Sequence, residues 1–390
     1  MLTDLTIVIV TVLAGAVLFY PKLSRAAGWR ATVTPLASII GSGFLVLGPV
    51  LDDSFGAFAP LVMLGLCAVA YAFGGAIRAN IYDIDTNPDR GRGIARLETV
   101  ASWLLAGAYF ISVAYYLNLF GAFAATLTPW DGALPARIIT TVTYAVILLV
   151  GWVYGFHAME RMEQASVTLK LAIIAGLLAG LGVHFTDQAI AGGLVINPVT
   201  VSGWGAVTLA FGLIVTVQGF ETSRYLGDTY SADMRVRSMR WAQLISAAIY
   251  MIYICLLVYL FPAGHVPLSE TAVIDMMAIV APVLPPLLIV AALSAQFSAA
   301  VADTGGSGGL VTELTKGRLG TGQSYAVLVA VGLALTWGAD VFAIIAYASR
   351  AFAAYYAVQA AIAAQRGRPI YWGLAILGAV IAIFGRSVEG

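Results

Sequence analysis

The sequence has little charge, little cysteine and no excess of either sign. Only 10% of the 390 residues are charged, and 61% are hydrophobic, whereas a soluble domain carries about 25% charged residues. The 20 basic residues balance the 20 acidic ones, so the composition does not predict a basic face for nucleic acid. Cys67 and Cys255 both lie in apolar runs, which excludes a disulfide scaffold. The chain also lacks the G-x-x-x-x-G-K-[ST] motif of ATP-driven transport.

Long apolar runs fill most of the chain. A helix needs about 20 apolar residues to cross the hydrocarbon core of a bilayer. We therefore predict an all-α polytopic membrane protein with about twelve transmembrane helices. Their expected ranges are 3–20, 32–51, 56–79, 98–127, 137–156, 164–184, 204–226, 238–261, 284–308, 324–338, 341–363 and 369–385.

The basic residues alternate between the two sides of this map. Cytoplasmic connections of membrane proteins are enriched in Lys and Arg, and nearly all basic residues fall on one side. The exceptions are Arg137, Arg350 and Arg386. This pattern places both termini outside, and we expect the protein in the plasma membrane of a bacterium.

Two of the expected helices carry interruptions. The second contains Gly41-Ser42-Gly43, and each glycine costs about 1 kcal/mol relative to alanine in a helix. The seventh contains a polar interruption at 217–221. If the N-terminal helix is not counted, these are the first and sixth helices, and inverted repeats that each begin with a discontinuous helix are typical of transporters. The alternative is that Gly41 and Gly43 only allow close packing of helices.

This plan divides the chain into two repeats of five helices. Residues 1–30 form an extra N-terminal helix and linker, 31–187 the first repeat, 188–365 the second repeat, and 366–390 a C-terminal helix. Lys170 and Arg350 then lie in the fifth helix of each repeat, which supports the correspondence.

An unwound helix at mid-membrane depth has a specific chemistry. Its N–H end suits a carboxylate, and its C=O end suits an ammonium group or an alkali cation. A zwitterion can therefore bind without a charged side chain.

Three stretches resemble a known family. Residues 39–44, IIGSGF, resemble the IGSGIF segment that opens permeases of the amino acid–polyamine–organocation (APC) superfamily. Residues 217–233 resemble the sixth helix of that family, and 155–157 with 168–171 resemble its passage across the fourth and fifth helices. The resemblance implies a LeuT-like fold and transport by alternating access. The extra N-terminal helix and residues 291–308 are more similar to sodium–solute symporters.

Two buried charges are candidates for ion coupling. The resembled fold places Lys170 and Asp303 on neighbouring helices beside the first interruption. Burial disfavours the charged forms of both groups, so either could exchange a proton near neutral pH. We predict a proton-sensitive pair, with Thr304 and Ser307 as hydrogen-bonding support.

Two other interpretations of these charges remain open. The pair could be a structural tie between two helices. Alternatively, a sodium ion could be bound by the carbonyls of Ala37 and Ile40 together with Asp303 and Thr304, while Lys170 extends toward the cytoplasm.

Several other residues have two interpretations each. Tyr115 and Tyr116 could close over a substrate or pack in the core, and Phe220 could seal the cavity from water. Glu221 could bind a substrate amine or cap the second half of the broken helix. Arg350 could pair with an acid, line an exit path, or extend its charge to the interface.

We therefore predict a secondary active transporter for an amino acid or a related small organic amine, with a proton as the coupling ion and sodium as the alternative. Gly41, Ser42 and Gly43 would hold a carboxylate, and carbonyls around Val217 and Gln218 would take the amine, with Gly219 at the break. No cofactor and no metal are expected, and the oligomeric state is open. A solute sensor that transports nothing is the main rival. A membrane enzyme is disfavoured because no catalytic groups cluster in the sequence.

Overall fold

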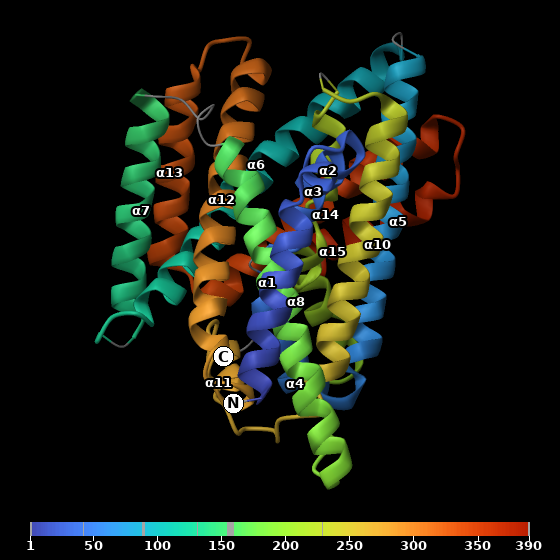
Figure 1. Ribbon diagram of the computed structural model, residues 1–390. Helices are drawn as coiled ribbons and strands as arrows, with labels where there is room; N and C mark the ends of the chain where they lie inside the picture. Colours follow the sequence, from blue (N-terminus) through green and yellow to red (C-terminus); the bar gives the residue numbers. More distant parts are fainter. Residues whose placement is uncertain are drawn as a thin grey trace.

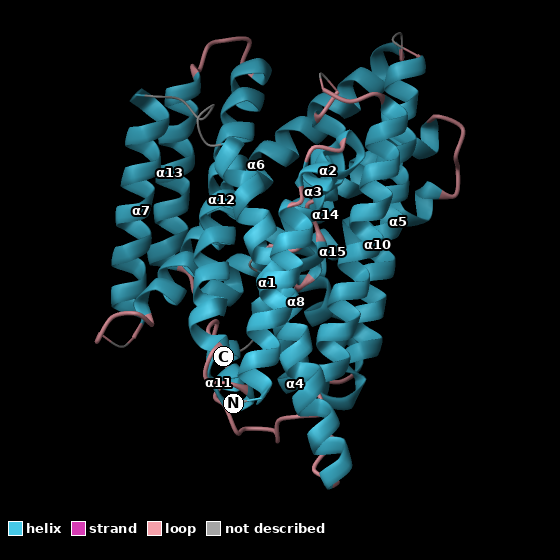
Figure 2. Ribbon diagram, in the orientation of Figure 1, coloured by secondary structure: helices cyan, strands magenta, loops and turns pink. Residues whose placement is uncertain are grey.

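The computed structural model describes residues 2–41, 43–87, 90–130, 132–153, 160–227 and 229–388, with only the backbone of 153 and 160–165. Every regular element within these ranges is a helix (Figures 1 and 2). The elements are α1 (Leu2–Phe19), α2 (Pro21–Ser24), α3 (Ala27–Ile39), α4 (Gly43–Phe55), η1 (Gly56–Phe58), α5 (Ala59–Thr86), α6 (Gly91–Ala125), α7 (Ala133–Val153), α8 (Glu160–Ala191), α9 (Gly203–Gly212), η2 (Ile214–Val217), η3 (Phe220–Tyr225), α10 (Ala232–Leu257), α11 (Ala272–Val280), α12 (Leu284–Leu314), α13 (Thr321–Gly338), α14 (Val341–Gln365) and α15 (Tyr371–Phe384).

The helices have the length and composition of an integral membrane protein. Among the described residues, 8 helical segments are long and apolar enough to cross a bilayer. Away from their ends, helices satisfy their backbone hydrogen bonds internally, which is a requirement in lipid. Within the described residues, one to three helical segments lie in each of the expected ranges. The count of about twelve crossings and the division into two repeats remain predictions.

The helix α6 runs obliquely through the middle of the molecule (Figure 1). It packs against α12, α14 and α7, while α10 packs against α5 and α3. The first helix, α1, lies on the outside against α8, where the buried side chain of Ile7 contacts Gly180. The interrupted segments pack against helices that are distant in sequence: α3 contacts α10 and η3, and η2 contacts α14.

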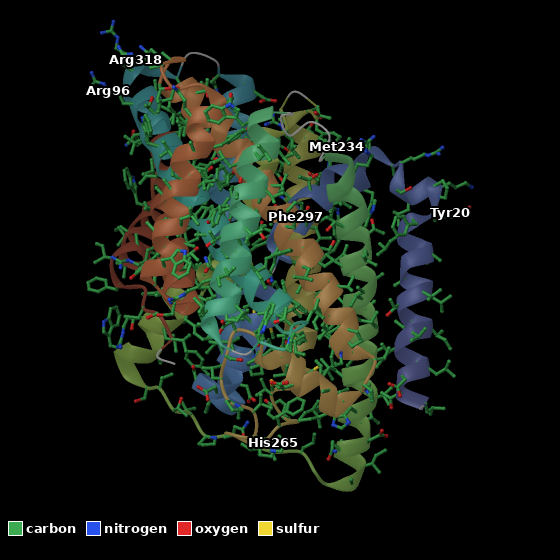
Figure 3. The ribbon with its side chains drawn as sticks, turned by 90° about the vertical axis from the view of Figure 1, so that its left-hand side faces the viewer. Tyr20, Arg96, Met234, His265, Phe297 and Arg318 are labelled. Atoms are coloured by element: carbon green, nitrogen blue, oxygen red, sulfur yellow. The ribbon has the colours of Figure 1, made fainter. Side chains whose placement is uncertain are left out.

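Two exposed arginines and the chain termini lie at opposite ends of the molecule. Arg96 and Arg318 are at one end and His265 is at the other (Figure 3). Both termini lie toward the end that holds α11, opposite to these arginines (Figure 1). We call the end with Arg96 and Arg318 the basic end. Its assignment to the cytoplasm remains a prediction from the charge pattern.

Candidate functional site

Both predicted interruptions are present as breaks between helices. The first lies between the end of α3 at Ile39 and the start of α4 at Gly43, and Ile40 has the non-helical angles φ −86° and ψ 63°. At the second break, Gln218 is extended and Gly219 has a φ of 114°. Ser42, which is part of the predicted carboxylate site, lies outside the described residues.

The two breaks lie directly against each other. A Cβ atom on Gly219 would lie 2.5 Å from the Cβ of Ser38 and 2.8 Å from the backbone nitrogen of Ile39. A Cβ atom on Gly43 would lie 3.0 Å from the Cα of Thr216. Each break therefore needs a glycine where it meets the other, because any side chain would push the two segments apart.

One tyrosine connects the two breaks through its hydroxyl group. The hydroxyl of Tyr250, on α10, lies 3.1 Å from the carbonyl oxygen of Ile39 and 2.5 Å from that of Thr216. Both carbonyls belong to helix ends whose oxygens lack intrahelical partners. The hydroxyl has a single proton to donate, so it is shared between the two segments.

Glu221 caps the second break. Its side chain is 1% exposed, and Oε2 accepts hydrogen bonds from the backbone N–H of Gly219 at 3.1 Å and from the hydroxyl of Tyr356 at 2.8 Å. The Tyr356 hydroxyl also lies 3.2 Å from Oε1 of Gln218. Of the two interpretations of Glu221, the capping contact is therefore the one that is formed.

Aromatic side chains surround the breaks. Phe220 is fully buried and stacks on Tyr356 with 5.1 Å between ring centroids. Tyr115 and Tyr116, from α6, lie 5.1 Å apart by the same measure, and a Cβ atom on Gly41 would lie 3.9 Å from the Tyr116 ring. The structure thus gathers the described members of the predicted substrate site, namely Gly41, Gly43, Val217, Gln218, Gly219, Phe220, Tyr115 and Tyr116, along the two broken segments and the facing part of α6.

Lys170 lies at the end of the first half-helix. Its side chain is 5% exposed, and its ammonium group donates a hydrogen bond of 2.9 Å to the carbonyl oxygen of Ala37. Ala37 belongs to the last turn of α3, where the helix dipole favours a positive charge. Lys170 therefore points at the break, not toward the cytoplasm as the sodium interpretation requires.

Asp303 lies away from Lys170. Its carboxylate accepts a hydrogen bond from the hydroxyl of Ser112 on α6. The helices α8 and α12 run in opposite directions (Figure 1) and meet where the hydroxyls of Ser166 and Ser294 are 2.6 Å apart. At about 1.5 Å per residue, Lys170 lies about 6 Å from this contact in one direction and Asp303 about 13 Å in the other.

None of the ion pairs given for the described residues joins Lys170 to Asp303, and this offset argues against the predicted pair, which stays a prediction. The same offset separates Thr304 and Ser307 from Lys170, and the hydroxyls of these two residues donate to carbonyls of their own helix at 2.6 and 2.9 Å. The alternative sodium site, which joins Ala37 and Ile40 to Asp303 and Thr304, stays a prediction.

Another polar residue of α12 lies between the levels of Lys170 and Asp303. Gln296 is fully buried, and within the described part of the chain neither atom of its amide group has a hydrogen-bond partner. It is two residues from Ser294, and it shares a helix face with Asp303 because seven residues make about two turns. A buried amide without a hydrogen-bond partner lowers stability by about 1–3 kcal/mol per polar group. Gln296 is therefore a candidate for binding the substrate or the coupling ion, and it was not among the residues predicted from the sequence. Its only signal is that it is a lone amide in an apolar run.

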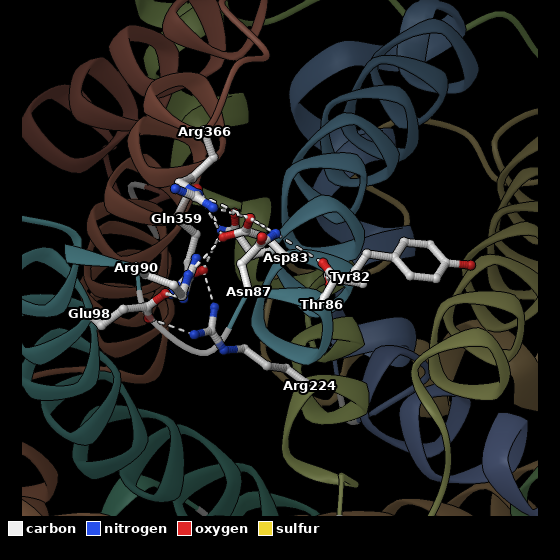
Figure 4. Close-up of polar contacts among 10 residues, drawn as sticks. Tyr82, Asp83, Thr86, Asn87, Arg90, Glu98, Arg224, Gln359 and Arg366 are labelled. Carbon is white, nitrogen blue, oxygen red and sulfur yellow. Dashed lines mark hydrogen bonds and ion pairs between the residues drawn. The ribbon is translucent and has the colours of Figure 1, made fainter.

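A second polar cluster lies toward the basic end. Arg90 pairs with Asp83 and with Glu98, each at 2.7 Å, and Glu98 also accepts from Arg224 at 2.5 Å (Figure 4). Arg366 donates to Asp83 at 2.8 Å. We call these five residues the ion network. It joins α5, α6, the second broken segment and the C-terminal end of α14.

A buried amide extends the ion network. Gln359, on α14, accepts hydrogen bonds through Oε1 from Arg224 and, at 2.8 Å, from Asn80 of α5. The side chains of Arg90, Asp83 and Glu98 are 10%, 14% and 21% exposed. These arginines indicate the orientation of the chain in the sequence, but their acidic partners are not predictable from it.

Arg350, unlike Lys170, does not contact a helix break. It is exposed, and its Nε donates a hydrogen bond of 2.8 Å to the carbonyl of Ala382 in α15. This contact ties α14 to the last helix and does not reach either break. The motif at 155–157 lies outside the described residues.

Comparisons with known proteins agree with this architecture. A family model described as an APC superfamily transporter matches residues 21–385. An uncharacterized protein of Aquifex aeolicus (strain VF5) is 39% identical over 388 residues, which are 95% of this chain and 93% of that protein. Crystal structures of two single-residue mutants of the Eremococcus coleocola manganese transporter have a similar fold, with TM-scores of 0.56 and 0.59. Both are 15% identical and cover 92% of this chain and 87% of theirs.

Proposed function

The chain belongs to the APC superfamily of transporters, and we propose that it carries an amino acid or a related small organic amine by alternating access, with a proton as the coupling ion. In this proposal, residues 31–187 and 188–365 are two inverted repeats that each begin with a broken helix. Both termini lie on the extracellular side of the plasma membrane.

The contact between Lys170 and Ala37 is the observation that carries the proton proposal. The last carbonyls of a half-helix suit a cation, and here an ammonium group occupies that place. A protonated Lys170 holds α3 against α8. When the proton leaves, the neutral amine loses its charge-assisted bond, which weakens the hold on α3.

The two breaks provide the substrate-binding groups. The start of α4 at Gly43 presents backbone N–H groups toward a carboxylate. The carbonyls near Val217 and Gln218 suit an amine, and that of Thr216 is already engaged by Tyr250. Phe220, which is buried beside the second break, would seal the site when it is loaded.

Uptake by the purified protein in vesicles tests this proposal. We would compare a labelled amino-acid mixture under an inward proton gradient, an inward sodium gradient and no gradient. We expect saturable, proton-stimulated uptake in the wild type and in Arg350→Gln, the matched control in the other proposed repeat. Lys170→Met should abolish the stimulation by protons.

Three results would contradict the proposal. If sodium stimulates uptake and the Lys170→Met variant retains this stimulation, Lys170 is not a proton-coupling site. Uptake of labelled Mn²⁺ without uptake of amino acids would identify a metal ion as the substrate, as the names of the two similar structures state for those proteins. Binding of an amino acid without uptake under any gradient would favour a sensor.

A further inference from the structure

An apolar groove of about 520 Å³ opens between α5, α9 and α15. Apolar side chains and glycine line it, and Ser202 contributes the only polar side chain among the lining residues. It is distinct from the two breaks, except that Ile214, the first residue of η2, is also among its lining residues.

The groove follows one face of α5. Phe58, Val62, Gly65 and Val69 line it, and this spacing keeps them on one side of the helix. Eleven residues of helix span about 16 Å. Half of a hydrocarbon core of about 30 Å is about 15 Å, so the groove is as long as one leaflet is thick.

We propose that the groove binds one acyl chain of a phospholipid from the leaflet at the end opposite to the basic end. The groove is continuous with the surface of α5 that faces lipid, because the neighbouring side chains of Leu61 and Leu64 are 63% and 52% exposed. A chain in the groove touches protein on several sides. An empty groove would lose these dispersion contacts.

The bound chain reaches the second break. Its inner end packs against Phe211, in the last turn of α9, and against Ile214. Between these two residues the helix changes to the short turn η2. The chain therefore fills the space beside a segment that moves during transport, an effect that depends on the proposed function. The binding itself does not depend on it.

Photolabelling of the whole protein in vesicles tests the binding. The vesicles would contain phosphatidylethanolamine, phosphatidylglycerol and a phospholipid with a photoactivatable diazirine on one acyl chain. Adducts would be located by mass spectrometry. Gly65 lines the groove, and a Cβ atom there meets nothing within 4 Å, so Gly65→Leu places a bulky side chain at the groove without a clash at its first atom. Gly107→Leu, at an equally open position on α6, is the matched control.

We expect adducts to concentrate on the groove in the wild type and in Gly107→Leu. In Gly65→Leu they should fall to the level of the other lipid-facing helices, and Val62→Phe, one turn away, should give the same loss. Adducts spread evenly over all lipid-facing helices, or undiminished groove labelling in both groove variants, would overturn the proposal. The measurement needs no transport, so a failure here is distinguishable from a failure of the proposed function.

Discussion

The ion network predicts that Arg224 keeps the basic end of the molecule closed. Arg224→Gln removes the 2.5 Å contact with Glu98, which leaves Arg90 as the ionic partner of Glu98 among the described residues. Loss of one partner from a buried ion pair costs about 3–5 kcal/mol, and an exposed pair contributes about 0–1 kcal/mol. Because Glu98 is 21% exposed and stays paired, we expect about 1–3 kcal/mol. At about 1.4 kcal/mol per tenfold change, the closed population falls about 5- to 150-fold relative to the open one.

Access to a buried cysteine measures this change. Ser112 is fully buried on α6, so a Ser112→Cys reporter, made in a variant without Cys67 and Cys255, reacts with a water-soluble maleimide only after this end opens. Arg224→Gln should raise the labelling rate. Arg318→Gln, which removes an exposed arginine at the same end, should leave it unchanged. Equal rates in all three proteins would refute the idea that the ion network closes this end.

Two further substitutions test the contact between the breaks. Gly219→Ala should lower stability by about 2–5 kcal/mol, because the positive φ costs about 1–2 kcal/mol and the new Cβ meets the backbone beside Ser38 with an overpacking cost of about 1–3 kcal/mol. An unchanged midpoint of thermal unfolding in detergent would contradict this. Tyr250→Phe should cost about 1–3 kcal/mol because the carbonyl of Thr216 loses its buried partner, and uptake should fall. The exposed Tyr347 provides the control. If Tyr347→Phe lowers stability and uptake as much as Tyr250→Phe does, the hydrogen bond of the Tyr250 hydroxyl is not the cause of the loss.

Local composition predicted the helices and their breaks well. Long apolar runs left few alternatives to membrane helices, and the glycines at 41, 43 and 219 marked the positions where the chain leaves helical geometry. The short helix α11 was not predicted, because nine residues between two longer helices are too few to stand out from a loop. These successes depend on information carried within a single stretch of sequence.

Contacts between distant stretches were harder to predict. The family resemblance placed Lys170 and Asp303 on neighbouring helices, which suggested that they meet. The offset between α8 and α12 is set instead by packing, at Ser166 and Ser294, and no sequence pattern encodes it. The partners in the ion network are likewise far apart in the chain, with 126 residues between Glu98 and Arg224. Their charges were visible in the sequence, but the pairing was not.

The contact between the breaks also suggests how a change at Lys170 reaches the substrate site. Lys170 holds α3 through Ala37, two residues before Ile39, whose carbonyl shares the Tyr250 hydroxyl with the second break. Gly219 rests on the same turn of α3. Because a close-packed contact transmits displacement, α3 cannot shift without disturbing the second break. We therefore expect the proton-linked signal to pass from α8 through α3 to the second break, a route in which Asp303 has no part.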